Sequence, residues 1–113
     1  MILPHDALFS PLKMGALALP NRILMAPLTR CRAEDEHVPG PLMAEYYAQR
    51  ATGGLIIAEA TMAMAGNSAF WREPGIYSTA QIDGWARVVQ AASAASGPCM
   101  GSPHKGQYSG SGA

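Results

Sequence analysis

The chain has 113 residues and no net charge at neutral pH, and 49% of its residues are hydrophobic. This length allows one domain at most, and a neutral chain gives no electrostatic reason to expect nucleic acid or an anionic membrane as a partner. Because there is neither a run of apolar residues long enough to span a membrane nor a signal-peptide pattern at the N-terminus, we expect a cytoplasmic location.

The first predicted element is a short β-hairpin. Two apolar triplets, Leu12–Met14 and Leu17–Leu19, flank Gly15 and Ala16. Glycine followed by any residue fits a two-residue type II′ turn, so we expect the triplets to pair as antiparallel strands.

The chain is organised around the apolar run Ile23–Ala26, which ends at Pro27. Such a run is typical of a parallel strand buried on both faces, and proline ends it because it cannot donate to a ladder. Thr29 and Arg30 are therefore expected just past the strand, where α/β folds place their chemistry. The same pattern recurs in Leu55–Thr61.

A helix is predicted between the two strands. Pro41 suits the first turn of a helix, and Gly53 and Gly54 follow its end, so we expect a helix over Pro41–Ala51. Spacing of i,i+4 places four residues on its apolar stripe: Leu42, Met43, Tyr46 and Tyr47.

A second helix follows a long connection. Residues 61–77 contain turn residues throughout and are expected to form a functional loop or irregular structure. Ser78–Gln81 then has the pattern of a capping box, in which the serine and glutamine side chains bind each other's backbone amides. Behind it, helical spacing predicts an apolar stripe formed by Ile82, Trp85, Ala86, Val89 and Ala92.

The order strand, helix, strand, helix predicts an α/β fold with a right-handed βαβ unit. By alternation a third strand is due near Gly97, but residues 97–113 contain five glycines and three serines, a composition typical of linkers. We therefore divide the chain into a folded part, residues 1–96, and a glycine- and serine-rich tail, residues 97–113.

Other candidate motifs are weak. Gly101–Gly106 has glycines at Walker spacing, but Gln107 and Tyr108 replace the required Lys-Ser/Thr pair, and the three histidines are scattered, so we predict neither a nucleotide loop nor a metal site. Glu59 lies at a strand end and is a candidate catalytic acid. A role in binding backbone amides or an arginine is favoured, because buried carboxylates need partners.

The two strand ends are more informative together. Small residues and exposed backbone at Pro27–Thr29 and Ala60–Thr61 would let a flat ring approach two adjacent strands, and a threonine hydroxyl offers one hydrogen bond. These features predict a site for some ligand, with ordinary loop anchoring as the alternative.

A set of short motifs between Leu8 and Ala95 has a familiar combination: Leu8–Leu12, Leu19–Arg22, Met25–Arg30, Pro41–Tyr47, Glu59–Thr61, Pro74–Ser78 and Gln81–Trp85. Together they strongly resemble the old yellow enzyme family of FMN-dependent ene-reductases, which includes the oxophytodienoate, morphinone and nitrate-ester reductases. Any one motif would be weak, whereas the set is highly specific.

The resemblance implies a (β/α)8 TIM barrel with the flavin at its C-terminal mouth. This chain would supply a hairpin that plugs the barrel's bottom and the first two βα units, and would be truncated before the third strand. The resemblance also implies that Pro27, Leu28 and Thr29 line the FMN ring, with the Thr29 hydroxyl tuning its potential. It places Ala60 near the reactive edge of the ring and Phe70 at the wall of the substrate pocket.

The family's reaction is ping-pong. NAD(P)H reduces FMN, which passes hydride to the β-carbon of an activated, α,β-unsaturated alkene while a tyrosine protonates the α-carbon. The family's proton donor, substrate-carbonyl ligands and phosphate-binding residues have no counterpart in this chain, and Pro98–Ser102 stands where a strand with a glutamine and a Trp-His pair is due. We therefore expect no catalytic residue to be retained, and a prematurely ended or frame-shifted gene is the simplest explanation.

Two hypotheses follow. In the first, the chain is an incomplete, inactive portion of an ene-reductase whose affinity for FMN is low. In the second, it is a non-catalytic α/β fragment that associates with a partner supplying the rest of the barrel. Two parallel strands leave two open edges, so we also expect marginal or no independent folding, and self-association through those edges.

Overall fold

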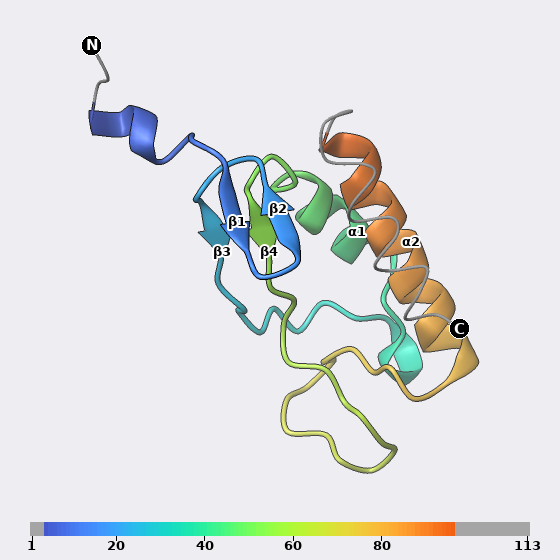
Figure 1. The fold of residues 1–113 in the computed structure, drawn as a ribbon. Helices are drawn as coiled ribbons and strands as arrows, with labels where there is room; N and C mark the ends of the chain where they lie inside the picture. The colour runs from blue at the N-terminus through green and yellow to red at the C-terminus, as the bar shows by residue number, and fades with distance from the viewer. Residues whose placement is uncertain (1–3, 97–113) are drawn as a thin grey trace.

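The computed structural model describes residues 4–96 (Figure 1). The predictions made for the tail, including the Gly101–Gly106 motif, lie outside this range. The elements in chain order are η1 (Pro4–Ala7), β1 (Leu12–Met14), β2 (Leu17–Leu19), β3 (Leu24–Met25), η2 (Asp35–His37), α1 (Pro41–Ala48), β4 (Leu55–Ile56) and α2 (Thr79–Ala95), where η marks a 3-10 helix.

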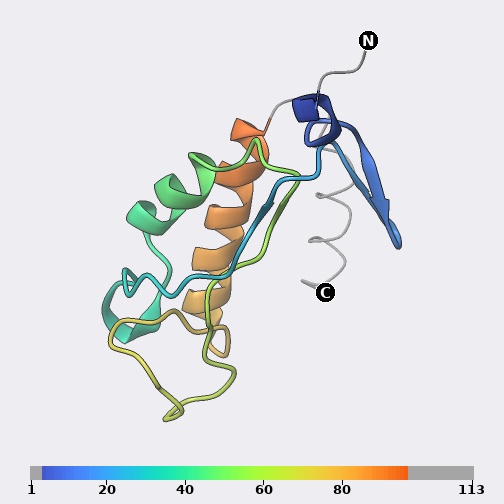
Figure 2. The same cartoon turned by 90° about the vertical axis from the view of Figure 1, so that its left-hand side faces the viewer.

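The strands form two small sheets. β1 pairs with β2 as the antiparallel hairpin expected from the sequence, and Gly15 at its turn has the positive φ, +60°, that the first central position of a type II′ turn requires. β3 pairs with β4 in parallel, with Leu24 opposite Leu55 and Met25 opposite Ile56. The helices lie on one side of the β3–β4 pair and the hairpin on the other (Figure 2). The predicted βαβ arrangement of two parallel strands joined through a helix is confirmed.

The apolar runs alone predicted strands buried on both faces, whereas one face is covered in this structure, as expected for two βα units without the remaining strands of a barrel. Met25 and Ile56 pack against the core, but Leu24 is 40% exposed and Ile57 is 44% exposed. Side chains alternate between the faces of a strand, and within residues 4–96 the helices cover one face. The paired region is also shorter than the apolar runs, although hydrogen bonds from Gly54 N–H to Ile23 O (2.7 Å) and from Ile57 N–H to Met25 O (3.1 Å) continue the ladder at both ends.

Helix α1 ends at Ala48, three residues earlier than Ala51, the end expected from the sequence. Met43 and Tyr47 are buried as predicted, whereas Leu42 is 56% exposed. Adjacent residues of a helix point about 100° apart, so the rows 42/46 and 43/47 cannot both face one neighbour. The prediction for Leu42 was therefore wrong.

Helix α2 begins with the predicted capping box. The Gln81 N–H donates to Ser78 Oγ (3.2 Å), and the Ser78 N–H donates to Gln81 Oε1 (3.0 Å). The predicted apolar stripe is partly correct: Trp85 and Ala92 pack against the core, but Ile82 is 48% exposed and Ala86 is exposed. The fully buried residues of α2 are Gln81, Gly84 and Val88.

Two contacts with residues distant in the chain explain why Gln81 and Gly84 face inward. Gln81 Nε2 donates to Glu36 O (2.9 Å), which holds that side chain on the inner face. Gly84 lies against Pro39, and a Cβ at this position would be 2.5 Å from Pro39 O. Close approach of backbone to a helix is a use of glycine that an apolar pattern does not reveal.

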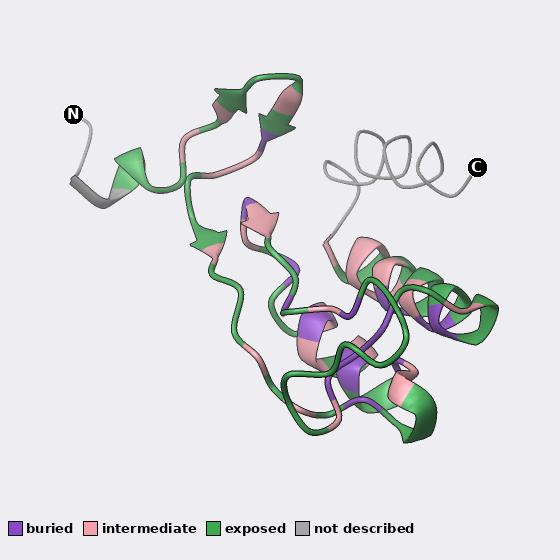
Figure 3. Cartoon of the chain, turned by 90° about the horizontal axis from the view of Figure 1, so that it is seen from below, coloured by how far each residue is buried: buried purple, intermediate pink, exposed green. Residues whose placement is uncertain are grey.

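The core lies between the two helices and the covered face of the β3–β4 pair. Its buried residues are Ala33, Met43, Tyr47 and Val88, and Met25, Ile56 and Trp85 are among the partly buried residues around them. Figure 3 shows that burial is concentrated around α1, α2 and the segments between them, whereas the hairpin is mostly exposed. No helix among the described residues is long and apolar enough to cross a membrane.

The connection between β4 and α2 is irregular, as the sequence predicted. The two ends of this connection lie side by side and are joined by an isolated parallel bridge between Met62 and Gly75. Hydrogen bonds from Met62 N–H to Pro74 O (2.9 Å) and from Ile76 N–H to Met62 O (3.0 Å) close its base. The loop projects beyond the C-terminal ends of β3 and β4 (Figures 1 and 2).

Candidate functional site

The C-terminal ends of β3 and β4 lie at the same edge of their sheet because the strands are parallel and in register. Thr29 and Ala60 each lie four residues past the paired Met25 and Ile56. A hydrogen bond from Arg30 N–H to Glu59 Oε1 (3.4 Å) joins the two chain segments there. The structure therefore brings together Pro27, Leu28, Thr29 and Ala60, which we call the strand-end edge.

The surface of the strand-end edge is largely apolar. Pro27, Leu28 and Ala60 are exposed, and Leu28 is 56% exposed. Thr29 is half-buried, and among the described residues its hydroxyl has no hydrogen-bond partner. Small apolar groups beside a free hydroxyl can accommodate a flat ring that accepts or donates one hydrogen bond.

Glu59 is buried directly beside this edge, with 4% of its surface exposed. Its Oε2 accepts a hydrogen bond from the Tyr47 hydroxyl (2.8 Å), and its own N–H donates to the same hydroxyl (3.1 Å). Because its Oε1 also accepts from the Arg30 amide, the favoured role of Glu59 in binding backbone amides is confirmed.

The contribution of Tyr47 was missed in the sequence. Burial raises the pKa of its hydroxyl above the ordinary tyrosine value, and the carboxylate of Glu59 adds to this shift. Tyr47 therefore remains a neutral donor. Its position on the buried row of α1 was a usable signal, because a buried tyrosine hydroxyl normally has a polar partner.

Phe70 lies on the loop between β4 and α2 and is 48% exposed. The buried carboxylate of Glu73 fixes the backbone around it, since Glu73 Oε1 accepts from the amides of Ala69 (2.6 Å) and Phe70 (3.3 Å). Burial opposes ionisation of Glu73, but these amides, the Ser68 hydroxyl and nearby His37 hold its pKa below the usual value. Within residues 4–96, no hydrogen bond or ring contact joins Phe70 to the strand-end edge.

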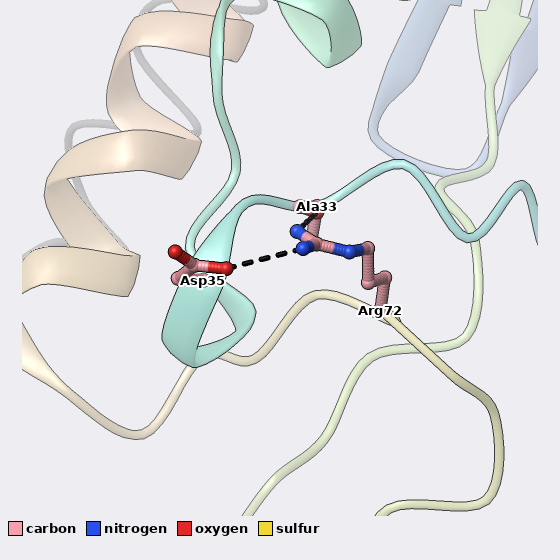
Figure 4. A network of polar contacts seen from close by, with 3 residues as sticks. All are labelled: Ala33, Asp35 and Arg72. Carbon is pink, nitrogen blue, oxygen red and sulfur yellow. Dashed lines mark hydrogen bonds and ion pairs between the residues drawn. The ribbon is translucent and has the colours of Figure 1, made fainter.

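The same loop is tied to the segment that follows β3. The Arg72 backbone accepts a hydrogen bond from Ala33 N–H (3.1 Å), and its guanidinium binds Ala33 O (3.2 Å) and Asp35 Oδ1 (3.1 Å) (Figure 4). Arg72 has a positive φ of +52°, which is uncommon for a residue other than glycine. Asp35 is largely exposed, so we assign the linkage mainly to the two backbone contacts.

Two grooves lie near these loops. One of about 240 Å³ lies between α1 and the segments that follow β3 and β4, and its lining includes Tyr46, Arg30 and Glu59 from these three parts. The other, about 590 Å³ and more open, includes Cys31, Trp71 and Arg72. Neither includes a residue of the strand-end edge, which is an open surface. Among the described residues, no three His, Cys, Asp or Glu side chains gather as a metal site requires.

Comparison with known proteins gives a consistent result. Residues 7–98 match the model of the NADH:flavin oxidoreductase / NADH oxidase family. A curated relative from Leishmania infantum, named "Probable flavin mononucleotide-dependent alkene reductase", is 49% identical over 86 residues, which are 76% of this chain and 24% of that protein.

Solved structures agree. The old yellow enzyme from Trypanosoma cruzi is 52% identical with a TM-score of 0.75, over 80% of this chain and 24% of that one. Morphinone reductase in complex with tetrahydroNAD is 50% identical with a TM-score of 0.76, over 80% of this chain and 25% of that one. The chain thus spans about a quarter of the length of the relatives it matches.

Proposed function

The chain belongs to the NADH:flavin oxidoreductase / NADH oxidase family, and we propose that residues 4–96 form a hairpin and the first two βα units of a (β/α)8 barrel of this family. The resemblance to old yellow enzymes is confirmed by the relatives above. Two observations support the barrel: β3 and β4 are parallel, and the helices cover only one of their faces. The other face exposes Leu24 and Ile57, against which further strands would pack. In such a barrel the hairpin would plug the bottom, since it lies before the start of β3.

The strand-end edge is proposed to contact the ring of FMN. In a complete barrel the cofactor would supply hydride transfer between NAD(P)H and the activated double bond of an α,β-unsaturated substrate. Pro27, Leu28 and Ala60 would pack against the ring, and the Thr29 hydroxyl would supply a hydrogen bond to it. The residues present fit a flat, partly polar ring, because the edge is apolar, unobstructed and carries that one free hydroxyl. Phe70 would form a wall of the substrate pocket.

The observation that carries this proposal is the in-register parallel pair. It places the segment with Thr29 and the segment with Ala60 at the same edge. A shift of one residue would reverse which side chains face the helices, so the covered row of Met25 and Ile56 sets the register.

We propose no catalytic residue in the chain. Tyr47 is linked to the strand-end edge through Glu59, but it is buried and its hydroxyl donates to that carboxyl group, so it is unsuited to protonate a substrate. The chain by itself would then not catalyse the reaction of the family. Residues 97–113 would not contribute to the barrel. The cytoplasmic location remains a prediction.

The proposal can be tested by titrating the purified chain with FMN while flavin fluorescence and circular dichroism are followed. We expect binding that weakens about tenfold in Thr29→Ala, the value of one hydrogen bond of about 1.4 kcal/mol. Thr52→Ala is the matched control, because Thr52 is exposed and precedes β4 at the opposite end of the strand. A folded chain that binds no FMN, or equal affinities for all three proteins, would reject the proposal.

A second function has support from the exposed apolar face of the β3–β4 pair. With Leu24 and Ile57 uncovered and two open strand edges, the chain would associate with a partner that supplies further strands, or with itself. Mixing the chain with the remainder of the Trypanosoma cruzi old yellow enzyme tests this function. Recovery of tight flavin binding and NAD(P)H oxidation only in the mixture would support it, whereas sedimentation as separate monomers would exclude it.

A further inference from the structure

We propose that Glu59 and Tyr47 are positioning residues that set the spacing between the Pro27–Thr29 segment and Ala60. The proposal rests on the function proposed above, because that function gives the strand-end edge its ligand. Neither residue touches that edge's exposed surface, and both act through the backbone segments they hold.

The first step is the location of the carboxylate. Glu59 directly precedes Ala60, and its Oε1 accepts from the amide of Arg30, which directly follows Thr29. The side chain therefore spans the two segments beyond the end of the β3–β4 ladder, whose last backbone hydrogen bond among the described residues runs from Ile57 N–H to Met25 O. Past that point, backbone pairing no longer fixes the distance between the segments.

The second step is the support that Tyr47 gives to the carboxylate. Its hydroxyl donates to Glu59 Oε2 (2.8 Å) and accepts from Glu59 N–H (3.1 Å), so both the side chain and the backbone of Glu59 are held from α1. Tyr47 itself is 3% exposed and belongs to the core with Met43 and Val88. A rigid core element thus determines where Glu59, and with it the Arg30 amide, is placed.

The third step concerns energy. A carboxyl group that is 4% exposed is costly to bury without partners, and its hydrogen bonds offset that cost. The sequence could place an apolar residue here at lower cost to stability. A buried polar side chain that joins two ligand-lining segments is more readily explained by a need for defined geometry than by stability.

The test compares Glu59→Ala, Glu59→Gln and Tyr47→Phe with the unmodified chain, and Glu45→Ala serves as the control on the exposed side of α1. Amide hydrogen exchange is measured at Arg30 and at Val88, without flavin, and FMN affinity is measured separately. Glutamine keeps an acceptor for the Arg30 amide, whereas alanine removes it.

We expect Glu59→Ala to accelerate exchange at Arg30 at least tenfold more than at Val88, and to weaken FMN binding at least tenfold. Tyr47→Phe should also accelerate exchange at Arg30 and weaken FMN binding. In Glu59→Gln the exchange rate and the FMN affinity should be close to those of the unmodified chain. Glu45→Ala should change neither the exchange rate nor the affinity more than twofold. Restoration by glutamine separates positioning from a general loss of stability, because a general loss would accelerate amide exchange at Arg30 and at Val88 by the same factor.

The proposal is overturned if exchange at Arg30 and Val88 changes in parallel in every variant, or if Glu59→Gln behaves like Glu59→Ala. Should Glu59→Ala fail to fold, Tyr47→Phe and Glu59→Gln give the same comparison. If the unmodified chain binds no FMN, the proposed function fails, and the exchange at Arg30 alone still decides whether Glu59 holds the two segments.

Discussion

At the scale of single residues, the polar side chains near the loops are committed to backbone groups. Glu59 binds the Arg30 amide, Glu73 binds the Ala69 and Phe70 amides, and Arg72 binds the Ala33 carbonyl. The Thr29 hydroxyl differs from these groups because, within residues 4–96, it has no partner. This contrast is what makes Thr29 a candidate ligand contact and the two glutamates candidates for structural roles.

A pH-dependent change is expected around Phe70. Hydrogen bonds hold the folded-state pKa of Glu73 below that of the unfolded chain, about 4.3 for glutamate. The carboxylate therefore stabilises the loop above that unfolded value, and the stabilisation is lost as the pH falls through the lower folded-state pKa. NMR amide shifts of Ala69 and Phe70 should move together in that range.

The matched variants are Glu73→Gln, in which the two amide shifts should no longer titrate, and Glu45→Gln, in which they should titrate as in the unmodified chain. If the amide chemical shifts of Ala69 and Phe70 did not change with pH in the unmodified chain, the hydrogen bonds to Glu73 would be contradicted.

At the scale of elements, the starts of the two α-helices were easier to predict than their buried faces. The Ser78–Gln81 capping box formed as expected because both of its bonds are local in sequence. The inward row of α2 was only partly predicted: Trp85 and Ala92 pack against the core as expected, whereas Gln81 and Gly84 face inward because of contacts with Glu36 and Pro39, which are distant in sequence.

Loss of the N-cap should destabilise α2. We expect Ser78→Ala to lower the free energy of unfolding by about 1 kcal/mol, since one helix-end amide loses its acceptor. Thr79→Ala, at the first helical position, should change it by less than about 0.5 kcal/mol. Urea unfolding followed by circular dichroism measures both, and equal effects would show that the cap contributes nothing.

The inner row of α2 can be tested at Gly84. Alanine is favoured over glycine in a helix by about 0.8–1 kcal/mol, but its Cβ would lie 2.5 Å from Pro39 O. We expect a net loss of about 1–3 kcal/mol as the helix is forced outward. Asp83→Ala, one position away and exposed, should be nearly neutral in the same urea experiment, and a stabilising Gly84→Ala would refute the close contact.

At the scale of the whole molecule, the described residues have one covered sheet face and one uncovered face. The helices and the covered face share a small core, while Leu24, Leu28 and Ile57 remain largely exposed. This asymmetry is expected for two βα units of a barrel, since the inward face of a barrel is packed by strands that lie elsewhere around it.

Two neighbouring isoleucines test this arrangement. Ile56→Ala should cost about 2–4 kcal/mol, because Ile56 packs against the core. Ile57→Ala should cost less than about 1 kcal/mol in the chain alone, because Ile57 is 44% exposed. Urea unfolding measures both changes, and equal costs would mean that the outer face is covered in solution.

The sequence by itself determined the family, the hairpin turn, the capping box, the irregular loop and the position of Pro27, Leu28, Thr29 and Ala60 after two strands. These follow from local chemistry: glycine at a turn, proline at a strand end, and side chains that bind amides a few residues away. Tertiary structure decided which face of each element is buried, the pairing of Tyr47 with Glu59 and the linkage of Arg72 to Ala33. Those depend on neighbours distant in the chain, and a periodic pattern allows several such arrangements until packing selects one.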